Sequence, residues 1–195
     1  MLICVTKRLL CSGDFLKHME QLVQARPYAV LLREKDLDAV AYELLASAVK
    51  AICDRHGVLL IAHQNISIAE KLRLTHVQMS MTALRSYQKT ALSPVIGASV
   101  HSVTEAEEAQ ELGAAYLVAG HIFDTDCKPG VPSRGLAFLR QVCRVAAVPV
   151  FAIGGITAGK VPDIMAAGAK GCCIMSAAMT TRSPEELVRS FGFHR

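Results

Sequence analysis

The sequence is poor in aromatic residues, and it lacks both a long apolar run and a run of basic residues. Aromatic residues make up 5% of the 195 residues, whereas hydrophobic residues make up 52%. The apolar content excludes a disordered chain, and the scarcity of aromatics favours aliphatic buried strands covered by Ala- and Leu-rich helices. No apolar stretch is long enough to span a bilayer, so no membrane partner is expected. The length suffices for one domain with a substantial core.

Charge and cysteine usage narrow the class of protein further. The net charge is +4 and the two signs are interleaved, so a small anionic ligand is expected and nucleic acid is not. The seven cysteines are an odd number without paired spacing, and Cys4, Cys172 and Cys173 sit inside apolar runs. Together with an N-terminus that reads as a strand and not as a secretory signal, they predict a reduced, cytoplasmic compartment. Cys127 lies in a polar loop, where an incidental thiol is favoured over a nucleophile.

Short apolar runs alternate with helical patterns along the whole chain. The predicted strands are Leu2–Thr6, Tyr28–Leu32, Val58–Ala62, His76–Met79, Val95–Ser99, Tyr116–Ala119, Pro149–Ile153 and Gly171–Met175. The predicted helices are Asp14–Gln24, Leu37–Arg55, Ile66–Leu72, Ala83–Lys89, one from the capping box Ser102–Glu105 to Leu112, Leu136–Val145, Ala158–Ala167 and a terminal helix capped by Ser183. Eight such units without a linker predict a single-domain (β/α)8 TIM barrel of small size over residues 1–195. A doubly wound open sheet is the alternative, but it usually has fewer strands, and no Gly-rich dinucleotide fingerprint is present.

Polar residues and glycines follow most of the predicted strands, where barrel proteins carry their function. They are Arg33, Lys35, His63, Gln78, Ser99, His101, His121, Gly154, Gly155, Met175 and Ser176. Several have a simpler alternative role: His101 is as consistent with packing at a helix start, Ser99 with a polar strand end, and Gln78 with satisfying backbone groups. His63 and Asn65 fit no metal motif and lack a third ligand, so no metal is expected.

Two stretches of the sequence are candidates for phosphate binding and for proton transfer. Gly154-Gly155 stands between a strand and a helix, and Met175-Ser176 follows the next strand, so both turns are candidates for holding a phosphate through backbone N–H groups. The alternative for the glycine pair is a tight turn alone. His121 opens the loop Gly120–Gly130 after a buried strand, where an imidazole is a candidate proton carrier or a structural histidine. Asp124 and Asp126 in that loop are interpreted as turn residues.

These residues resemble the thiamine phosphate synthase / TenI superfamily over nearly the whole chain. The resemblance lies in Leu31–Lys35, Gly97–His101, Ala152–Ile156 and Met175-Ser176. Gly120–Gly130, followed by Arg134-Gly135, is most similar to TenI-type thiazole tautomerase. The synthases carry a proline at the position of His121, and they have acids after strands 3 and 4 that serve magnesium and pyrophosphate. Here those places read His63-Gln64-Asn65 and Gln78–Met81, with no carboxylate.

The resemblance therefore implies a thiazole tautomerase of thiamine biosynthesis, an isomerase that needs no cofactor. Its substrate would be a small thiazole phosphate, a carboxylated dihydrothiazole bearing an ethyl phosphate. His121 would move the proton as base and then acid. Gly154, Gly155 and Ser176 would bind the phosphate, with Met175, Gln78, Ser99 and His101 lining the pocket, and Arg33 and Lys35 would hold the carboxylate. Lys128 matches the lysine that binds pyrophosphate in the synthases.

Two other functions remain open at this point. One is thiamine phosphate synthase, a magnesium-dependent transferase that joins pyrimidine pyrophosphate to thiazole phosphate. The other is a non-catalytic regulator that binds a phosphorylated ligand. A homodimer is expected from the family resemblance alone.

Overall fold

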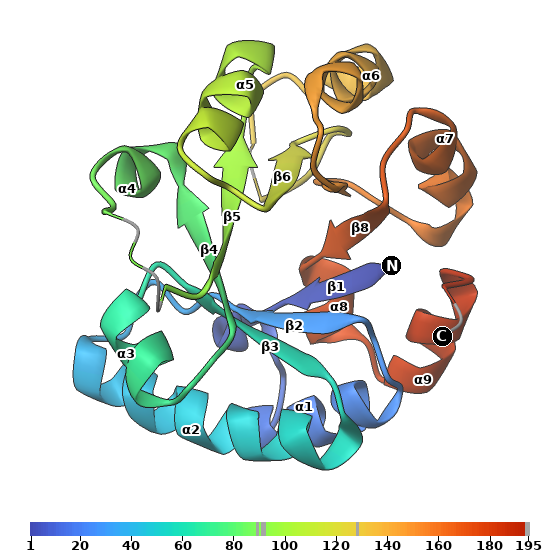
Figure 1. Ribbon diagram of the computed structural model, residues 1–195. Coiled ribbons are helices and arrows are strands. Elements are labelled where there is room, and N and C mark those ends of the chain that lie inside the picture. Colours follow the sequence, from blue (N-terminus) through green and yellow to red (C-terminus); the bar gives the residue numbers. More distant parts are fainter. Residues whose placement is uncertain (89, 91–92, 128, 194–195) are drawn as a thin grey trace. The chain divides into compact units, whose positions relative to one another are not determined.

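A computed structural model describes residues 1–88, 90, 93–127 and 129–193. Its parallel strands form a closed barrel in the order β1 to β8, so the predicted (β/α)8 TIM barrel is confirmed (Figure 1). The strands are β1 Leu2–Val5, β2 Ala29–Leu32, β3 Leu59–His63, β4 His76–Ser80, β5 Val95–Val100, β6 Tyr116–Gly120, β7 Val150–Ile153 and β8 Gly171–Ile174.

Helices alternate with these strands. They are the 3-10 helix η1 Arg8–Leu10, α1 Phe15–Gln24, α2 Ala39–His56, α3 Ile66–Lys71, α4 Met81–Arg85, α5 Val103–Glu111, α6 Gly135–Val145, the 3-10 helix η2 Ala158–Lys160, α7 Val161–Ala166, α8 Ser176–Thr180 and α9 Pro184–Ser190. The chain divides into two compact units, which we call unit 1 (Met1–Val77 with Ile174–Arg195) and unit 2 (Gln78–Cys173). The single domain over residues 1–195 stays a prediction.

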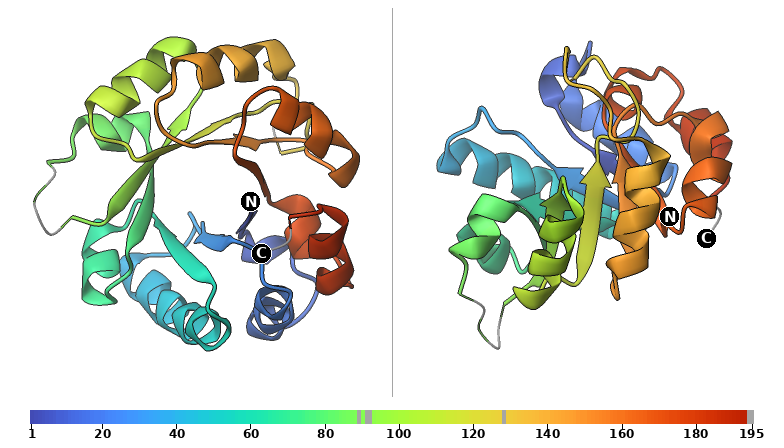
Figure 2. Two further views of the ribbon diagram at one scale, coloured as in Figure 1. Left: turned by 45° about the vertical axis from the view of Figure 1, so that its right-hand side comes forward. Right: turned by 90° about the horizontal axis from the view of Figure 1, so that it is seen from above.

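Unit 1 has its core between the sheet and helices α1 and α2. All four residues of β2 are buried, as expected for a parallel strand covered on both faces, and its register pairs Leu32 with Ala62 of β3. Helix α1 packs against α2 and α9 (Figure 2). Helix α2 ends at Gly57, whose φ of +65° forms the left-handed cap that glycine favours.

Unit 2 contains β5, β6 and β7 in parallel register, with Ser99 paired to Val118 and Gly120 to Ile153. Helices α5 and α6 pack against each other and cover these strands (Figure 1). The predicted N-cap is confirmed, because the Glu105 N–H donates to Ser102 Oγ at 3.0 Å. The reciprocal bond of a capping box differs, because the Glu105 carboxylate accepts from the His101 N–H in place of the Ser102 N–H.

Some element boundaries differ from the prediction. The helix expected from Ala83 begins at Met81, because Ser80 Oγ accepts from the Ala83 N–H at 3.3 Å, and the expected end at Lys89 lies outside the described residues. The helix expected over 158–167 is split into η2 and α7, with Pro162 in the first turn of α7. Ser183 precedes α9 but its side chain makes no capping bond. Helices η1 and α8 were not predicted.

Candidate functional site

Except for Gln78, the described residues that the sequence selected lie at or just beyond the carboxyl end of a strand. In unit 1, Arg33 and Lys35 follow β2, His63 ends β3, and Met175 and Ser176 follow β8. In unit 2, Ser99 lies near the end of β5, His101 and His121 come just after β5 and β6, and Gly154-Gly155 follow β7. Gln78 is the central residue of β4. Lys128 lies outside the described residues.

Gln78 and Ser99 are brought into contact inside unit 2. The Gln78 amide Nε2 donates to Ser99 Oγ at 2.9 Å, and Gln78 is only 1% exposed. Its amide oxygen Oε1 is buried without a hydrogen-bond partner in the part of the chain that the structure describes. This oxygen faces Gly97 beside the Tyr116 ring, because a Cβ added at Gly97 would meet both of them. The suggestion that Gln78 satisfies backbone groups therefore does not account for its carbonyl oxygen.

His101 is fixed at the start of α5. Its backbone N–H donates to Glu105 Oε2 at 2.6 Å, and its ring Nδ1–H donates to the Gly120 carbonyl at 2.6 Å. Arg134 Nε donates to the same carbonyl at 3.2 Å. The packing role considered for His101 is therefore present, while its contact with a ligand stays a prediction.

His121 lies directly after β6 and is 4% exposed. Its ring Nε2–H donates to the Val131 carbonyl at 3.2 Å, which ties the imidazole to the loop that precedes α6. The other ring nitrogen, Nδ1, is buried and has no hydrogen-bond partner among the described residues. The imidazole therefore presents one unsatisfied acceptor.

Glycine is required at positions 154 and 155 because the loop after β6 lies very close to the backbone there. A Cβ on Gly154 would lie 2.2 Å from the His121 Cβ, and one on Gly155 would lie 2.2 Å from the Asp124 carbonyl oxygen. Both glycines have positive φ, +101° and +63°. The tight turn considered as an alternative is thus present.

The outer side of this turn is held by hydrogen bonds to its carbonyls. The Gly154 carbonyl accepts from the Phe123 N–H at 3.1 Å. The Gly155 carbonyl accepts from Lys160 Nζ at 2.7 Å, and that ammonium lies 4.3 Å from the centre of the Phe123 ring. The Gly155 N–H donates to no backbone or side-chain group of the described residues, so it remains available to an anion.

In unit 1, the acidic side chains of the segment after β2 are bonded to Arg8. Glu34 is buried, and both of its carboxylate oxygens accept from the Arg8 N–H at 3.0 Å. Arg8 also pairs with Asp36 at 2.6 Å, and this hydrogen bond lowers the pKa of Asp36. Both acids are therefore engaged by Arg8, and Arg33 and Lys35 form the basic part of the segment.

His63 is one of the polar residues that the sequence places after a strand, and its role as a metal ligand was not expected. Burial, followed by the charges of Arg33 and Lys35, lowers the pKa of His63 from 6.5 to about 4. Its backbone N–H donates to the Tyr42 hydroxyl at 3.0 Å, and that hydroxyl donates to the Leu32 carbonyl at 2.8 Å. The sequence signal for His63 was its position at the end of a strand, but its proximity to two cations was visible only in three dimensions.

At the end of β8, Met175 is half-buried, and Ser176 is exposed at the first position of α8. Within the described residues there is no group of three or more His, Cys, Asp or Glu side chains that could hold a metal ion. No helix among them is both long enough and apolar enough to cross a membrane.

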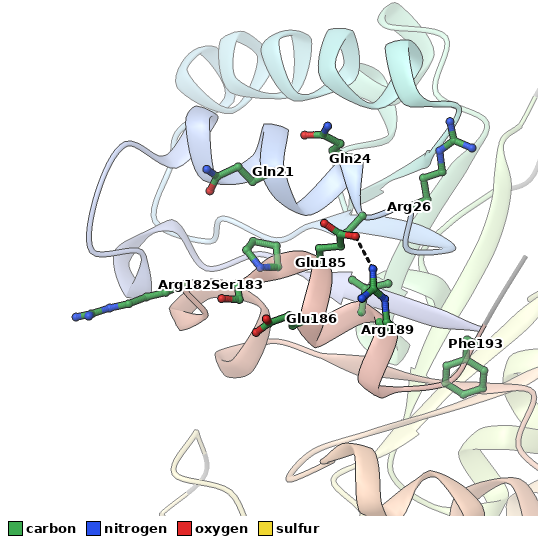
Figure 3. A pocket seen from close by; sticks show the side chains of 12 residues that line it. Gln21, Gln24, Arg26, Arg182, Ser183, Glu185, Glu186, Arg189 and Phe193 are labelled. Atoms are coloured by element: carbon green, nitrogen blue, oxygen red, sulfur yellow. Dashed lines mark hydrogen bonds and ion pairs between the residues drawn. The ribbon is translucent and has the colours of Figure 1, made fainter.

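A surface groove of about 800 Å³ lies elsewhere in unit 1, between the end of α1 and α9 (Figure 3). Its lining carries both signs of charge, and Glu185 pairs with Arg189 at 2.6 Å across one turn of α9. Because α1 ends just before β2 begins, this groove is at the amino end of that strand. Barrel proteins use the opposite end for function.

The family described as thiamine monophosphate synthase matches residues 2–178. A thiamine-phosphate synthase of Fusobacterium nucleatum subsp. nucleatum is 31% identical over 192 residues, which cover 95% of this chain and 92% of that protein. A thiamine-phosphate synthase of Caldivirga maquilingensis is 32% identical over 148 residues, 75% of this chain and 72% of that protein.

A solved structure of thiamine phosphate pyrophosphorylase from Pyrococcus furiosus superposes with a TM-score of 0.84 and 24% identity, covering 98% of this chain and 93% of that one. At this identity the likeness shows the fold.

The comparisons correct the interpretation as a thiazole tautomerase. That isomerase reading was wrong as the main activity, because relatives at about 30% identity over most of the chain are named thiamine-phosphate synthases, which are transferases. The reading depended on one loop with His121 and on two missing acids, whereas the similarity to the synthases extends over 2–178. By the extent of that match, the chain belongs to the thiamine monophosphate synthase family.

Proposed function

We propose that the chain is a thiamine-phosphate synthase, a transferase that joins a pyrimidine carrying a pyrophosphate to a thiazole phosphate and releases pyrophosphate. The observation that carries this proposal is the similarity to proteins of that name over nearly the full length of the chain. The small-molecule thiazole phosphate and the pyrimidine pyrophosphate are its proposed partners.

The chemistry of the strand ends supports two anionic substrates. Arg33 and Lys35 in unit 1 are cations suited to the charge that develops on a departing pyrophosphate. In unit 2, the Gly154-Gly155 turn offers the Gly155 N–H to a phosphate.

The side chains at the ends of β3 and β4 do not fit magnesium. Magnesium prefers hard oxygen ligands that usually include one or two carboxylates. The end of β3 supplies His63, Gln64 and Asn65, and β4 supplies Gln78, Met79 and Ser80. The carboxylate of Glu34 after β2 is buried and bonded to the Arg8 N–H. No step of the reaction is therefore assigned to a metal ion.

The test is to incubate the purified full chain with the two substrates and to measure thiamine phosphate and pyrophosphate together. Parallel reactions contain magnesium or EDTA. We expect both products in equal amounts, and we expect Arg33→Gln to lower kcat/KM at least tenfold because it removes one cation from the leaving group. The exposed Lys17→Gln of α1 is the matched control for loss of a positive charge. Absence of thiamine phosphate under all of these conditions would refute the proposal.

A further inference from the structure

Three basic side chains lie at the carboxyl ends of two neighbouring strands in unit 1. Because Leu32 is paired with Ala62, the next residues along β2 and β3 are Arg33 and His63, on adjacent strands. Lys35 follows two residues later, and its charge acts on the His63 imidazole together with that of Arg33. The Arg33 guanidinium forms no ion pair within the described chain.

The backbone around this cluster is held in place. The Tyr42 hydroxyl links the two strand ends, because it accepts from the His63 N–H and donates to the Leu32 carbonyl. The Arg33 N–H donates to Thr6 Oγ1 at 3.0 Å, and Thr6 is fully buried. The two acids of the segment, Glu34 and Asp36, are both bonded to Arg8. The cluster therefore combines a fixed backbone with the positive charge of Arg33, which no carboxylate of the described residues pairs with.

We propose that His63 completes an anion site with Arg33 and Lys35, and that a pyrophosphate group binds there together with a proton taken up by the His63 imidazole instead of with a divalent metal ion. This inference rests on the proposed function, since it assigns the site to the pyrophosphate of the pyrimidine substrate.

Binding of the anion and protonation of the His63 imidazole favour each other. In the free protein, burial and then the charges of Arg33 and Lys35 lower the pKa of His63 to about 4, so the imidazole is neutral at pH 7. A bound anion offsets those cations and raises the pKa of His63, and the imidazolium adds an N–H donor to the anion. The other charged or titratable groups facing this cluster are Tyr42, whose pKa burial raises to about 12, and Glu34, which is bonded to Arg8. Tyr42 therefore stays uncharged between pH 5 and 8.

The sign of the pH dependence follows from linkage. Because the bound form has the higher pKa, anion binding tightens as the pH falls through the pKa of the complex, and it levels off below the pKa of the free protein. If the anion raises the pKa of His63 by about two units, the affinity gained at low pH reaches about a hundredfold.

The experiment uses the full chain, inorganic pyrophosphate and EDTA, with titration calorimetry from pH 5 to 8 in two buffers of different ionisation enthalpy. NMR signals of the His63 ring report its protonation directly. We expect the parent protein to take up a proton when it binds pyrophosphate. Between pH 8 and pH 5, its affinity should rise at least tenfold more than the affinity of His63→Asn does. The pH dependence that remains in His63→Asn comes from the titration of pyrophosphate itself and is subtracted. His76→Asn, at the amino end of β4, is the matched control and should behave as the parent protein.

A second variant keeps the test valid if His63→Asn does not fold. His63→Lys places a permanent charge at the same position, so we expect tight pyrophosphate binding that no longer depends on the protonation of residue 63. An unchanged His63 titration in the complex, a requirement for magnesium, or the absence of pyrophosphate binding would each overturn the inference. This experiment measures binding and not turnover, so the two proposals can fail separately. If the chain binds pyrophosphate with proton uptake but forms no thiamine phosphate, only the proposed function is refuted.

Discussion

Gly154 is the residue whose replacement the structure constrains most sharply. An added Cβ would lie 2.2 Å from the His121 Cβ, and the φ of +101° is unfavourable for any other residue. We expect Gly154→Ala to lower the free energy of unfolding by about 3 kcal/mol or more, measured by urea titration. The control is Gly159→Ala in η2, where nothing lies within 4 Å of the added Cβ. The control should change stability by less than about 1 kcal/mol, and equal effects of the two changes would contradict the close approach of the two loops.

His63 also predicts how stability depends on pH. Its pKa is about 4 in the folded chain against 6.5 for an ordinary histidine, so the unfolded chain binds more protons between these values. Stability is therefore complete above pH 6.5 and is lost as the pH falls towards 4, by up to about 3 kcal/mol. Unfolding free energies of the parent and of His63→Asn, measured from pH 4 to 8, should diverge in slope over this range. Parallel curves would mean that His63 is not buried as a neutral ring.

At the residue scale, the sequence predicted positions better than it predicted interactions. That Arg33 and His121 lie at strand ends followed from the alternation of strands and helices. Three-dimensional contacts decided the rest: the unpartnered Oε1 of Gln78, the bond from His121 to Val131 and the two cations beside His63. The pattern of residues along one strand carries no information about which side chain of another element approaches it.

At the element scale, two serines at helix starts provide a matched pair. Ser102 Oγ accepts from the Glu105 N–H at the start of α5, whereas Ser183 makes no side-chain bond at the start of α9. We expect Ser102→Ala to lower the free energy of unfolding by about 1 kcal/mol and Ser183→Ala to leave it nearly unchanged. Thermal unfolding followed by circular dichroism compares the two variants, and a larger loss for Ser183→Ala would show that the cap assignment is incorrect.

Helix η2 is connected to the glycine turn through Lys160. Its ammonium donates to the Gly155 carbonyl and lies over the Phe123 ring, so Lys160→Met should lower stability by about 1–2 kcal/mol. Because the same contacts fix the turn that carries the Gly155 N–H, we also expect weaker binding of thiazole phosphate by calorimetry. Lys17→Met on the exposed face of α1 is the control, and the hypothesis fails if both variants bind alike.

Element types were predicted more reliably than element ends. The eight strands follow from short apolar runs, since buried parallel strands are apolar on both faces. Short elements such as η1 and α8 lack the length over which helical periodicity becomes visible. Ser183-Pro184 has the composition of a helix start, yet its serine side chain is not engaged, because composition alone does not fix a side-chain rotamer.

At the scale of the whole molecule, the extent of similarity outweighed a local motif. The loop around His121 favoured an isomerase, and the ends of β3 and β4 lack the acids of a magnesium site. The match over residues 2–178 nevertheless places the chain in the thiamine monophosphate synthase family. A motif of about ten residues describes one loop, whereas a match over the barrel constrains every strand end at which substrates bind.

Buried thiols provide a test of whether the barrel unfolds as one unit. Cys127 is exposed, whereas burial raises the pKa of Cys53 in unit 1 and of Cys172 in unit 2 to about 12 in each case. Because the strand order closes on itself, opening either unit breaks the hydrogen-bonded ring, so we expect one cooperative transition. Thiol labelling at increasing urea concentrations, read by mass spectrometry on Cys127→Ser, should give the same opening free energy for Cys53 and Cys172. A consistent difference of more than about 1 kcal/mol between the two thiols would show that units 1 and 2 unfold separately, and the single-domain prediction over residues 1–195 would then be wrong.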